Sequence, residues 1–306
     1  MASKRPTEKA MIKSVNQVYA LQRPGVSEAQ LPLVVDSPHS GTLYPFNSGI
    51  VAPADALQTT WDAFVDELWD YTPSVGGALL SARFPRAYID PNRAPDDIDQ
   101  DMLVQPWPDT VTPSAACSRG MGLIRRHALP GIPMYPGKLD IEEVQHRLRH
   151  YYQPYHTVLQ ALLDESVQRF GRVWHINCHS MKSVGNAMNV DNGAERPDIV
   201  VSDRKGISAS SALTEWIASE FDRRGYRVRI NTPYQGGYIV QHYGAPTQAR
   251  HSIQIEIKRS VYMNEKRCEK HEGFDRLQHD LSSFLGSLAE HLTQEMNQES
   301  SAKRAP

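Results

Sequence analysis

Cysteine is scarce in this chain, with only three among 306 residues. They are Cys117, Cys178 and Cys268, and none belongs to a Cys-x-x-Cys pair. A sparse, odd number argues against a disulfide framework and indicates a reducing compartment, so we expect a cytoplasmic protein. The missing pairs also exclude a zinc site built on thiolates, so any metal must be held by histidine and carboxylate side chains.

Long apolar runs and an excess of one charge are also missing. No apolar run approaches the roughly 18 residues of a membrane span, and 33 Lys and Arg stand against 35 Asp and Glu. Residues 1–13 are polar, unlike the apolar stretch of a signal peptide. We therefore expect a small-molecule substrate, with neither membrane nor nucleic acid as a partner. The oligomeric state stays open.

What is present is an alternation of short apolar runs and helical patterns. The predicted strands are 31–36, 77–82, 87–89, 172–176, 199–202, 226–230 and 252–257. The predicted helices are 60–71, 141–170 (bent near Pro154), 208–224 and 274–295, and the six prolines within 104–137 predict a loop region. This order favours an α/β fold with a largely parallel sheet covered by helices on both faces. We expect a single catalytic domain over residues 15–293, with flexible termini at 1–14 and 294–306.

Polar residues follow several predicted strands, and ligands bind at the carboxyl ends of strands in such sheets. His39, His179 and the segment Asp90-Pro91-Asn92-Arg93 occupy such positions, and Glu256 lies within an apolar strand. Two histidines and one carboxylate would complete the open three-ligand site of a catalytic zinc ion.

The carboxylate ligand could be either of two residues. Asp62 and Asp66 are four residues apart, so they would share one face of the helix predicted at 60–71. Each candidate also has a plain structural interpretation. The histidines could be hydrogen-bonded loop residues, the aspartates a solvated face, Arg93 a surface ion pair with Asp96 or Asp97, and Glu256 part of a partly wet strand face.

Six short motifs occur in a specific order. They are Ser37-Pro38-His39-Ser40-Gly41, Asp90-Pro91-Asn92-Arg93, Asn177-Cys178-His179-Ser180, Asp203-Arg204-Lys205-Gly206, Pro233-Tyr234-Gln235-Gly236-Gly237-Tyr238 and Gln254-Ile255-Glu256-Ile257. The ordered set resembles the N-formylglutamate amidohydrolase family over roughly residues 15–290. That family is related to zinc carboxypeptidases and aspartoacylases, so the resemblance implies a three-layer α/β/α fold with a mixed sheet.

The resemblance also implies roles for individual residues. His39 and His179 would bind zinc, Asn92 and Arg93 would bind a substrate carboxylate, and Glu256 would be the general base. Where zinc carboxypeptidases carry an acidic ligand three residues after the first histidine, this chain has Thr42. Asp62 is favoured as the acidic ligand because it would lie in the first helical turn, with Asp66 as the alternative. Arg86 is the candidate cation for the oxyanion.

The implied reaction is zinc-dependent hydrolysis of N-formyl-L-glutamate to formate and L-glutamate, a step of histidine degradation. Two alternatives remain: a related metallohydrolase that acts on another N-acyl amino acid or a short peptide, and a non-catalytic binding protein on the same fold. A thiol hydrolase that pairs Cys178 with His179 is disfavoured, because neighbouring residues in a strand point to opposite faces.

Overall fold

The computed structural model describes residues 11–25 and 29–302. Its centre is an eight-stranded mixed sheet with the strand order β1-β2-β4-β3-β7-β10-β8-β9. The strands are β1 (Met11–Val15), β2 (Tyr19–Pro24), β3 (Leu33–Ser37), β4 (Ala78–Ala82), β7 (Val173–Met181), β8 (Ile199–Ser202), β9 (Val228–Ile230) and β10 (Arg250–Lys258). Strands β4, β3, β7 and β10 form a parallel centre, whereas β2 and β8 join it antiparallel on either side. The expected largely parallel sheet is therefore parallel at its centre and mixed towards its edges.

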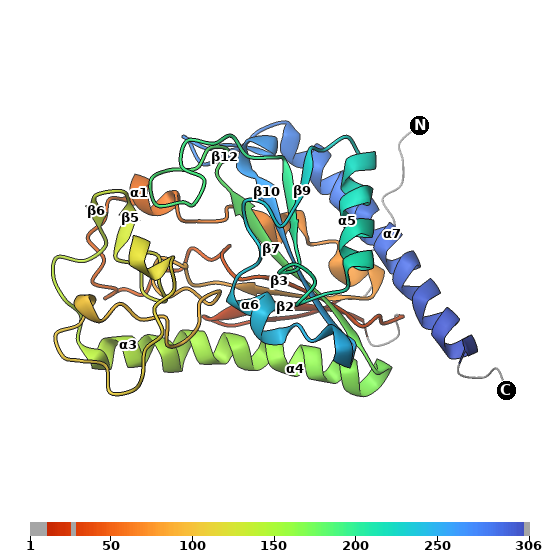
Figure 1. Cartoon of the computed structure of the whole chain (residues 1–306), viewed down its shortest axis with the longest axis horizontal. Helices are drawn as coiled ribbons and strands as arrows, with labels where there is room; N and C mark the ends of the chain where they lie inside the picture. Colours follow the sequence, from red (N-terminus) through yellow and green to blue (C-terminus); the bar gives the residue numbers. More distant parts are fainter. Residues whose placement is uncertain (1–10, 26–28, 303–306) are drawn as a thin grey trace.

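Helices cover both faces of this sheet, which gives the three layers expected from the sequence (Figure 1). The helices are α1 (Ala54–Gln58), α2 (Val65–Leu68), α3 (Ile141–Arg147), α4 (Gln153–Phe170), α5 (Ser211–Arg223), α6 (Tyr238–Tyr243) and α7 (Gly273–Ala302). Side chains alternate between the layers, because Leu33 and Val35 pack in the core under α5 and α7 while Val34 packs in the core under α4. Burial on both faces explains the near-continuous apolar runs of the central strands.

The helix predicted at 60–71 is wrong. Only α2 forms there, because Phe64 directly before it has a φ of 63°, outside the right-handed helical region. The Asp62 backbone N–H instead donates to the carbonyl of His39, which ties this segment to the loop after β3. Asp62 and Asp66 therefore do not share a helical face.

The strand predicted at 87–89 is also wrong. Tyr88 donates its N–H to Pro85 and closes a turn, and Asp90 then donates its N–H to Leu123. Strand β7 is longer than predicted, because it continues to Met181 and so contains His179. The small helix α6 was not predicted.

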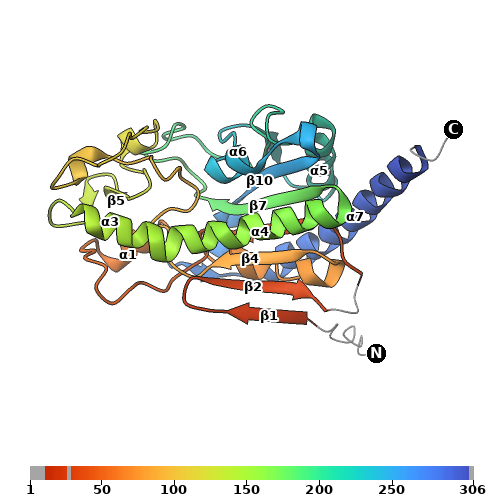
Figure 2. The same ribbon diagram turned by 90° about the horizontal axis from the view of Figure 1, so that it is seen from below.

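The remaining elements are short. They are the strands β5 (His127–Leu129), β6 (Ile132–Pro133), β11 (Met263–Asn264) and β12 (Glu269–Lys270), a π-helical turn at Leu148–Tyr152 and, among the described residues, five 3-10 turns. That turn joins α3 to α4 directly before Pro154, where the sequence predicted a bend. The predicted loop region 104–137 contains only the β5–β6 pair and a single 3-10 turn, and it lies beyond the end of the sheet towards which β7 points (Figure 2).

Regular elements extend past both expected domain boundaries. Strand β1 begins at Met11, before residue 15, and α7 continues to Ala302, beyond residue 293. Residues 1–10, at the start of the expected flexible terminus, lie outside the described residues. Among the residues that the structure describes, no helix is long and apolar enough to cross a bilayer.

Candidate active site

Three central strands bring the predicted site residues to one end of the sheet. His39 follows the end of β3 by two residues, His179 lies near the end of β7, and Glu256 lies near the end of β10. Glu256 pairs in register with His179 across the parallel β7–β10 ladder, so their side chains share one face of the sheet.

His39, Asp62 and His179 form one buried cluster at this end. One ligand atom from each lies within 4.8 Å of the others. The Asp62 Oδ2 atom is 3.3 Å from His39 Nδ1 and 3.0 Å from His179 Nδ1. Two imidazole nitrogens and one carboxylate oxygen form the donor set of a catalytic zinc site with an open position, so the residues present fit a divalent metal ion.

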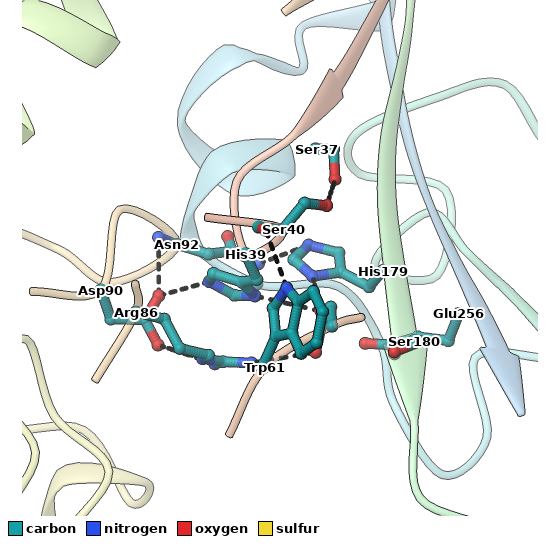
Figure 3. A network of polar contacts seen from close by, with 12 residues as sticks. Ser37, His39, Ser40, Trp61, Arg86, Asp90, Asn92, His179, Ser180 and Glu256 are labelled. Atoms are coloured by element: carbon teal, nitrogen blue, oxygen red, sulfur yellow. Dashed lines mark hydrogen bonds and ion pairs between the residues drawn. The ribbon is translucent and has the colours of Figure 1, made fainter. Parts of the chain in front are cut away.

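The outward ring nitrogens of both histidines also have partners. His39 Nε2 lies 2.7 Å from Asp90 Oδ1 (Figure 3). His179 Nε2 lies 2.7 Å from Asn177 Oδ1. When Nε2 donates a proton to an oxygen, Nδ1 carries the lone pair that a metal needs. Asp90 thus favours the His39 tautomer that turns a lone pair on Nδ1 towards Asp62, whereas His179 Nε2 faces both Asn177 Oδ1 and Asn92 Nδ2.

Asp62 is held by cations on its other oxygen. Arg259 Nη2 lies 3.0 Å from Asp62 Oδ1, and Arg86 Nη1 lies 3.9 Å from the same atom. Burial alone would raise the pKa of Asp62, but its side-chain contacts with His179 and His39 and the nearby charges outweigh it and hold that pKa well below its usual value. Asp62 is therefore ionised at neutral pH.

Asp66 lies apart from this cluster. Its carboxylate is not in the group of possible metal ligands, and its backbone N–H donates to Ser40 Oγ, 3.2 Å away. Burial raises the pKa of Asp66, with Glu67 adding to the effect. Of the two aspartates predicted from the sequence, the structure brings only Asp62 to the histidines.

Asp90 and Arg86 form a buried ion pair behind His39. Arg86 Nη2 and Nε lie 2.7 and 3.1 Å from Asp90 Oδ2, while Asp90 Oδ1 faces His39. Burial acts to raise the pKa of Asp90, but Arg86 and His39 outweigh it and keep that pKa well below its usual value. The sequence motif that contains Asp90 predicted no role for this residue, but the structure shows that Asp90 supports His39.

Glu256 is buried beside the cluster and accepts a hydrogen bond of 2.9 Å from Gln254 Nε2. Burial, the largest influence, raises its pKa; the charge of His179 acts in the opposite direction. A carboxylate with a raised pKa is a stronger base when it is ionised. The alternative of a partly wet strand face is wrong, because Glu256 is buried together with Gln254 and Lys258.

A cavity of about 280 Å³ opens onto these residues. His39, Asp62, His179 and Glu256 all line it. Its walls also carry a set of cationic side chains: Arg86, Arg93, Arg119, Arg125, Lys182, Arg196 and Arg259. Two carboxylates, those of Asp62 and Glu256, stand against these seven cations in the lining. The cavity therefore favours an anionic ligand.

Asn92 and Arg93 both line the cavity, but their environments differ. Asn92 Oδ1 accepts from the Ile239 N–H at 2.8 Å, and its Nδ2 lies 3.0 Å from His179 Nε2. Arg93 Nε is buried without a hydrogen-bond partner among the described residues, and its ion-pair partner there is Asp90, 4.0 Å away. The surface pair of Arg93 with Asp96 or Asp97 is therefore absent from the described part of the chain.

Two glycines near the site are required by close packing. A Cβ on Gly41 would lie 2.3 Å from the Arg83 carbonyl carbon, and one on Gly237 would lie 2.5 Å from Asn92 Nδ2. Gly41 thus allows the loop after β3 to pass against the end of β4, and Gly237 allows α6 to approach Asn92.

Cys178 faces away from the site. It packs in the core under α5 and α7, and burial raises its thiol pKa well above the usual value. The thiol hydrolase alternative is wrong, because the thiol and His179 lie on opposite faces of β7.

Comparison with known proteins decides the family. The sequence model of N-formylglutamate amidohydrolase matches residues 31–263, most of the chain.

The chain belongs to the N-formylglutamate amidohydrolase family.

Known relatives agree with this placement. The crystal structure of N-formylglutamate amidohydrolase from Ralstonia eutropha JMP134 is similar, with 41% identity, a TM-score of 0.87, and coverage of 92% of this chain and 100% of that one. N-formylglutamate deformylases from Pseudomonas putida and Pseudomonas aeruginosa are 28% and 29% identical, each match covering 78% of this chain and 84% of the relative. The gene product Atu2144 of Agrobacterium tumefaciens shares the fold at a TM-score of 0.63 and 18% identity, covering 93% of this chain and 97% of that one.

Some residues that line the cavity of this N-formylglutamate amidohydrolase family member could not be recognised as site residues from the sequence. Arg119 and Arg125 lie in the proline-rich region 104–137, which was expected only to be a loop. Arg196 follows a loop after β7 and pairs with Asp191. An arginine in a loop resembles any surface arginine until the fold shows which way it points.

Proposed function

We propose that this chain is a zinc-dependent amidohydrolase that cleaves N-formyl-L-glutamate to formate and L-glutamate. The observation that carries the proposal is the buried His39–Asp62–His179 cluster in a cavity that Glu256 also lines. The choice of N-formylglutamate as the substrate is based on the names of the amidohydrolase and deformylase relatives. The small cavity suits one amino acid derivative better than a peptide, because ligand pockets commonly measure about 300–1,000 Å³.

His39, Asp62 and His179 are the residues that would hold the zinc ion. A zinc ion bound there would lower the pKa of a water molecule to about 7 and so make hydroxide available at neutral pH. Asp90 and Asn177 keep both histidines oriented for this role.

Glu256 is the proton carrier in the proposed reaction. Its carboxylate takes a proton from the attacking water and delivers it to the leaving amine nitrogen as the C–N bond breaks. Arg86 lines the same cavity, where it stabilises the negative charge that develops on the carbonyl oxygen.

Arg93 and Asn92 bind the substrate α-carboxylate in this proposal. The Arg93 Nε atom is buried without a hydrogen-bond partner among the described residues, so it has a donor to offer. A guanidinium fork matches a carboxylate in two parallel hydrogen bonds. The Asn92 Nδ2 group lies 3.0 Å from His179 Nε2, which supports a position for this carboxylate next to the scissile amide.

A substrate panel tests the proposal directly. Zinc-loaded protein is incubated with N-formylglutamate, N-formylaspartate, N-acetylglutamate and short peptides, and both formate or acetate and free amino acid are measured. We expect fastest turnover with N-formylglutamate, loss of activity on chelation and recovery with zinc. Preference for the acetyl compound or a peptide would favour the related metallohydrolase, and inactivity on every compound would favour the binding protein.

A further inference from the structure

Arg125 is a buried cation in the cavity wall without an anionic partner among the residues described. Its exposed fraction is 7%, and its Nε has no hydrogen-bond partner within the described ranges 11–25 and 29–302. Other arginines of the cavity are paired: Arg86 with Asp90, Arg259 with Asp62, and Arg196 with Asp191. Arg125 therefore differs from them in having an unused positive charge.

Such a charge is costly to maintain. Burial, followed by repulsion from Arg86, lowers the pKa of Arg125 to about 9, while Asp90 acts in the opposite direction. The guanidinium still carries its proton at neutral pH. A buried, uncompensated charge destabilises a fold, and its presence in a ligand cavity is explained if a ligand supplies the missing anion.

We propose that Arg125 binds the side-chain carboxylate of the substrate and thereby selects dicarboxylic N-acyl amino acids. This inference rests on the proposed function, in which Arg93 binds the α-carboxylate. Arg125 and Arg93 both line the cavity and are close enough to influence each other's charge. Two arginines can thus hold the two ends of one dianion, each with a planar fork that matches a carboxylate.

The test compares two substrates that differ only in the side-chain charge. N-formylglutamate and N-formylglutamine have nearly the same size, and kcat/KM is measured for both with wild type, Arg125→Gln and Arg125→Lys. We expect wild type to prefer N-formylglutamate by roughly 10²-fold. Arg125→Gln should lose most of this preference, and Arg125→Lys should keep part of it because lysine supplies the charge without the fork.

Arg126→Gln is the matched control. Arg126 is the next residue, carries the same charge, is 39% exposed at its side chain, and pairs with Asp99 outside the cavity. This variant should retain the wild-type preference for N-formylglutamate.

Thermal unfolding separates substrate recognition from a structural role. Without ligand, Arg125→Gln should melt at the same temperature as wild type or higher, because an uncompensated buried charge is removed. Glutarate, a plain dicarboxylate, should raise the melting temperature of wild type more than that of Arg125→Gln. A lower melting temperature in both Arg125 variants, with the glutarate shift unchanged, would show a structural role and overturn the inference.

Two further outcomes have distinct meanings. The assignment of Arg125 is overturned if Arg125→Gln keeps the wild-type preference for N-formylglutamate over N-formylglutamine. It is also overturned if the variant keeps that preference but loses the preference for N-formylglutamate over its α-carboxamide. Failure of wild type to hydrolyse N-formylglutamate would instead count against the proposed function. The glutarate comparison reports on Arg125 in either case, so the two failures are distinguishable.

Discussion

His39 and Asp90 are 51 positions apart in the chain, yet His39 Nε2 lies 2.7 Å from Asp90 Oδ1 and both side chains are buried. Asp90 also binds Arg86, so its charge is compensated and its position is fixed. The pair leaves His39 Nδ1 facing Asp62, 3.3 Å from Oδ2. A carboxylate that orients a histidine in this way also raises the affinity of that histidine for metal.

Asp90→Asn should therefore weaken zinc binding. The amide can still accept a hydrogen bond from His39 but no longer supplies the negative charge, and we expect affinity to fall by about 10- to 100-fold. Competition with a chromophoric chelator measures the change. Asp101→Asn, at a side chain that is 90% exposed, is the control and should leave affinity unchanged. Equal affinity in both variants would contradict the role of Asp90.

The two aspartates predicted from the sequence should differ in metal content. Asp62→Asn should lose zinc on dialysis because a ligand oxygen is missing, whereas Asp66→Asn should keep the wild-type ratio of zinc to protein. Removal of the Asp62 charge also leaves Arg259 buried without its carboxylate, which costs about 3–5 kcal/mol of unfolding free energy. Folding is checked by circular dichroism. Loss of zinc from Asp66→Asn instead would reverse the assignment.

Glu256→Gln should separate turnover from metal binding. The amide keeps the shape of the side chain but removes the base, so we expect kcat to fall by about 10²-fold or more while zinc content and fold are retained. Single-turnover kinetics and metal analysis give the two readouts. Glu269→Gln, at a side chain that is 57% exposed, is the control. Near-normal turnover in Glu256→Gln would show that another group is the base.

Gly237→Ala should disturb the substrate site without unfolding the protein. The new Cβ would lie 2.5 Å from Asn92 Nδ2, so Asn92 or the start of α6 must shift. Because displacements of about 1 Å in a site can cost about 10²-fold, we expect kcat/KM to fall at least tenfold. At Gly137 a Cβ would meet nothing within 4 Å, so Gly137→Ala is the control. Equal activity in both would show that Asn92 need not hold its position.

The ion pairs of Asp198 should make stability depend on pH. Asp198 Oδ1 lies 2.6 Å from Lys258 Nζ; burial opposes ionisation, but Arg227 and Lys258 lower the pKa of this carboxyl to about 2. A pKa below the unfolded value of about 3.9 means that the stabilisation is complete above pH 4 and is lost as the pH falls towards 2. After screening by solvent, these ion pairs contribute about 1 kcal/mol to the free energy of unfolding. Urea unfolding of wild type and Asp198→Asn should differ by this amount at pH 7 and converge near pH 2; a constant difference would point to another cause.

The sequence predicted the layers of the fold better than its local details. The central strands were recognisable because burial on both faces requires near-continuous apolar residues, as at Leu33, Val34 and Val35. The helix predicted at 60–71 failed because apolar periodicity says nothing about the left-handed backbone of Phe64. The edge strands β1 and β2 were missed because partly exposed strands lack a strong apolar pattern.

The sequence by itself determined the family, through ordered short motifs, and the residue types that a metal site needs. Only the tertiary structure decided that Asp62 joins His39 and His179, that Asp90 supports His39, and that Arg125 lines the cavity. The reason is physical. A carboxylate or guanidinium has the same chemistry in a surface loop and in a buried site, and what distinguishes the two is the neighbours that long-range strand pairing and loop packing bring within about 3 Å.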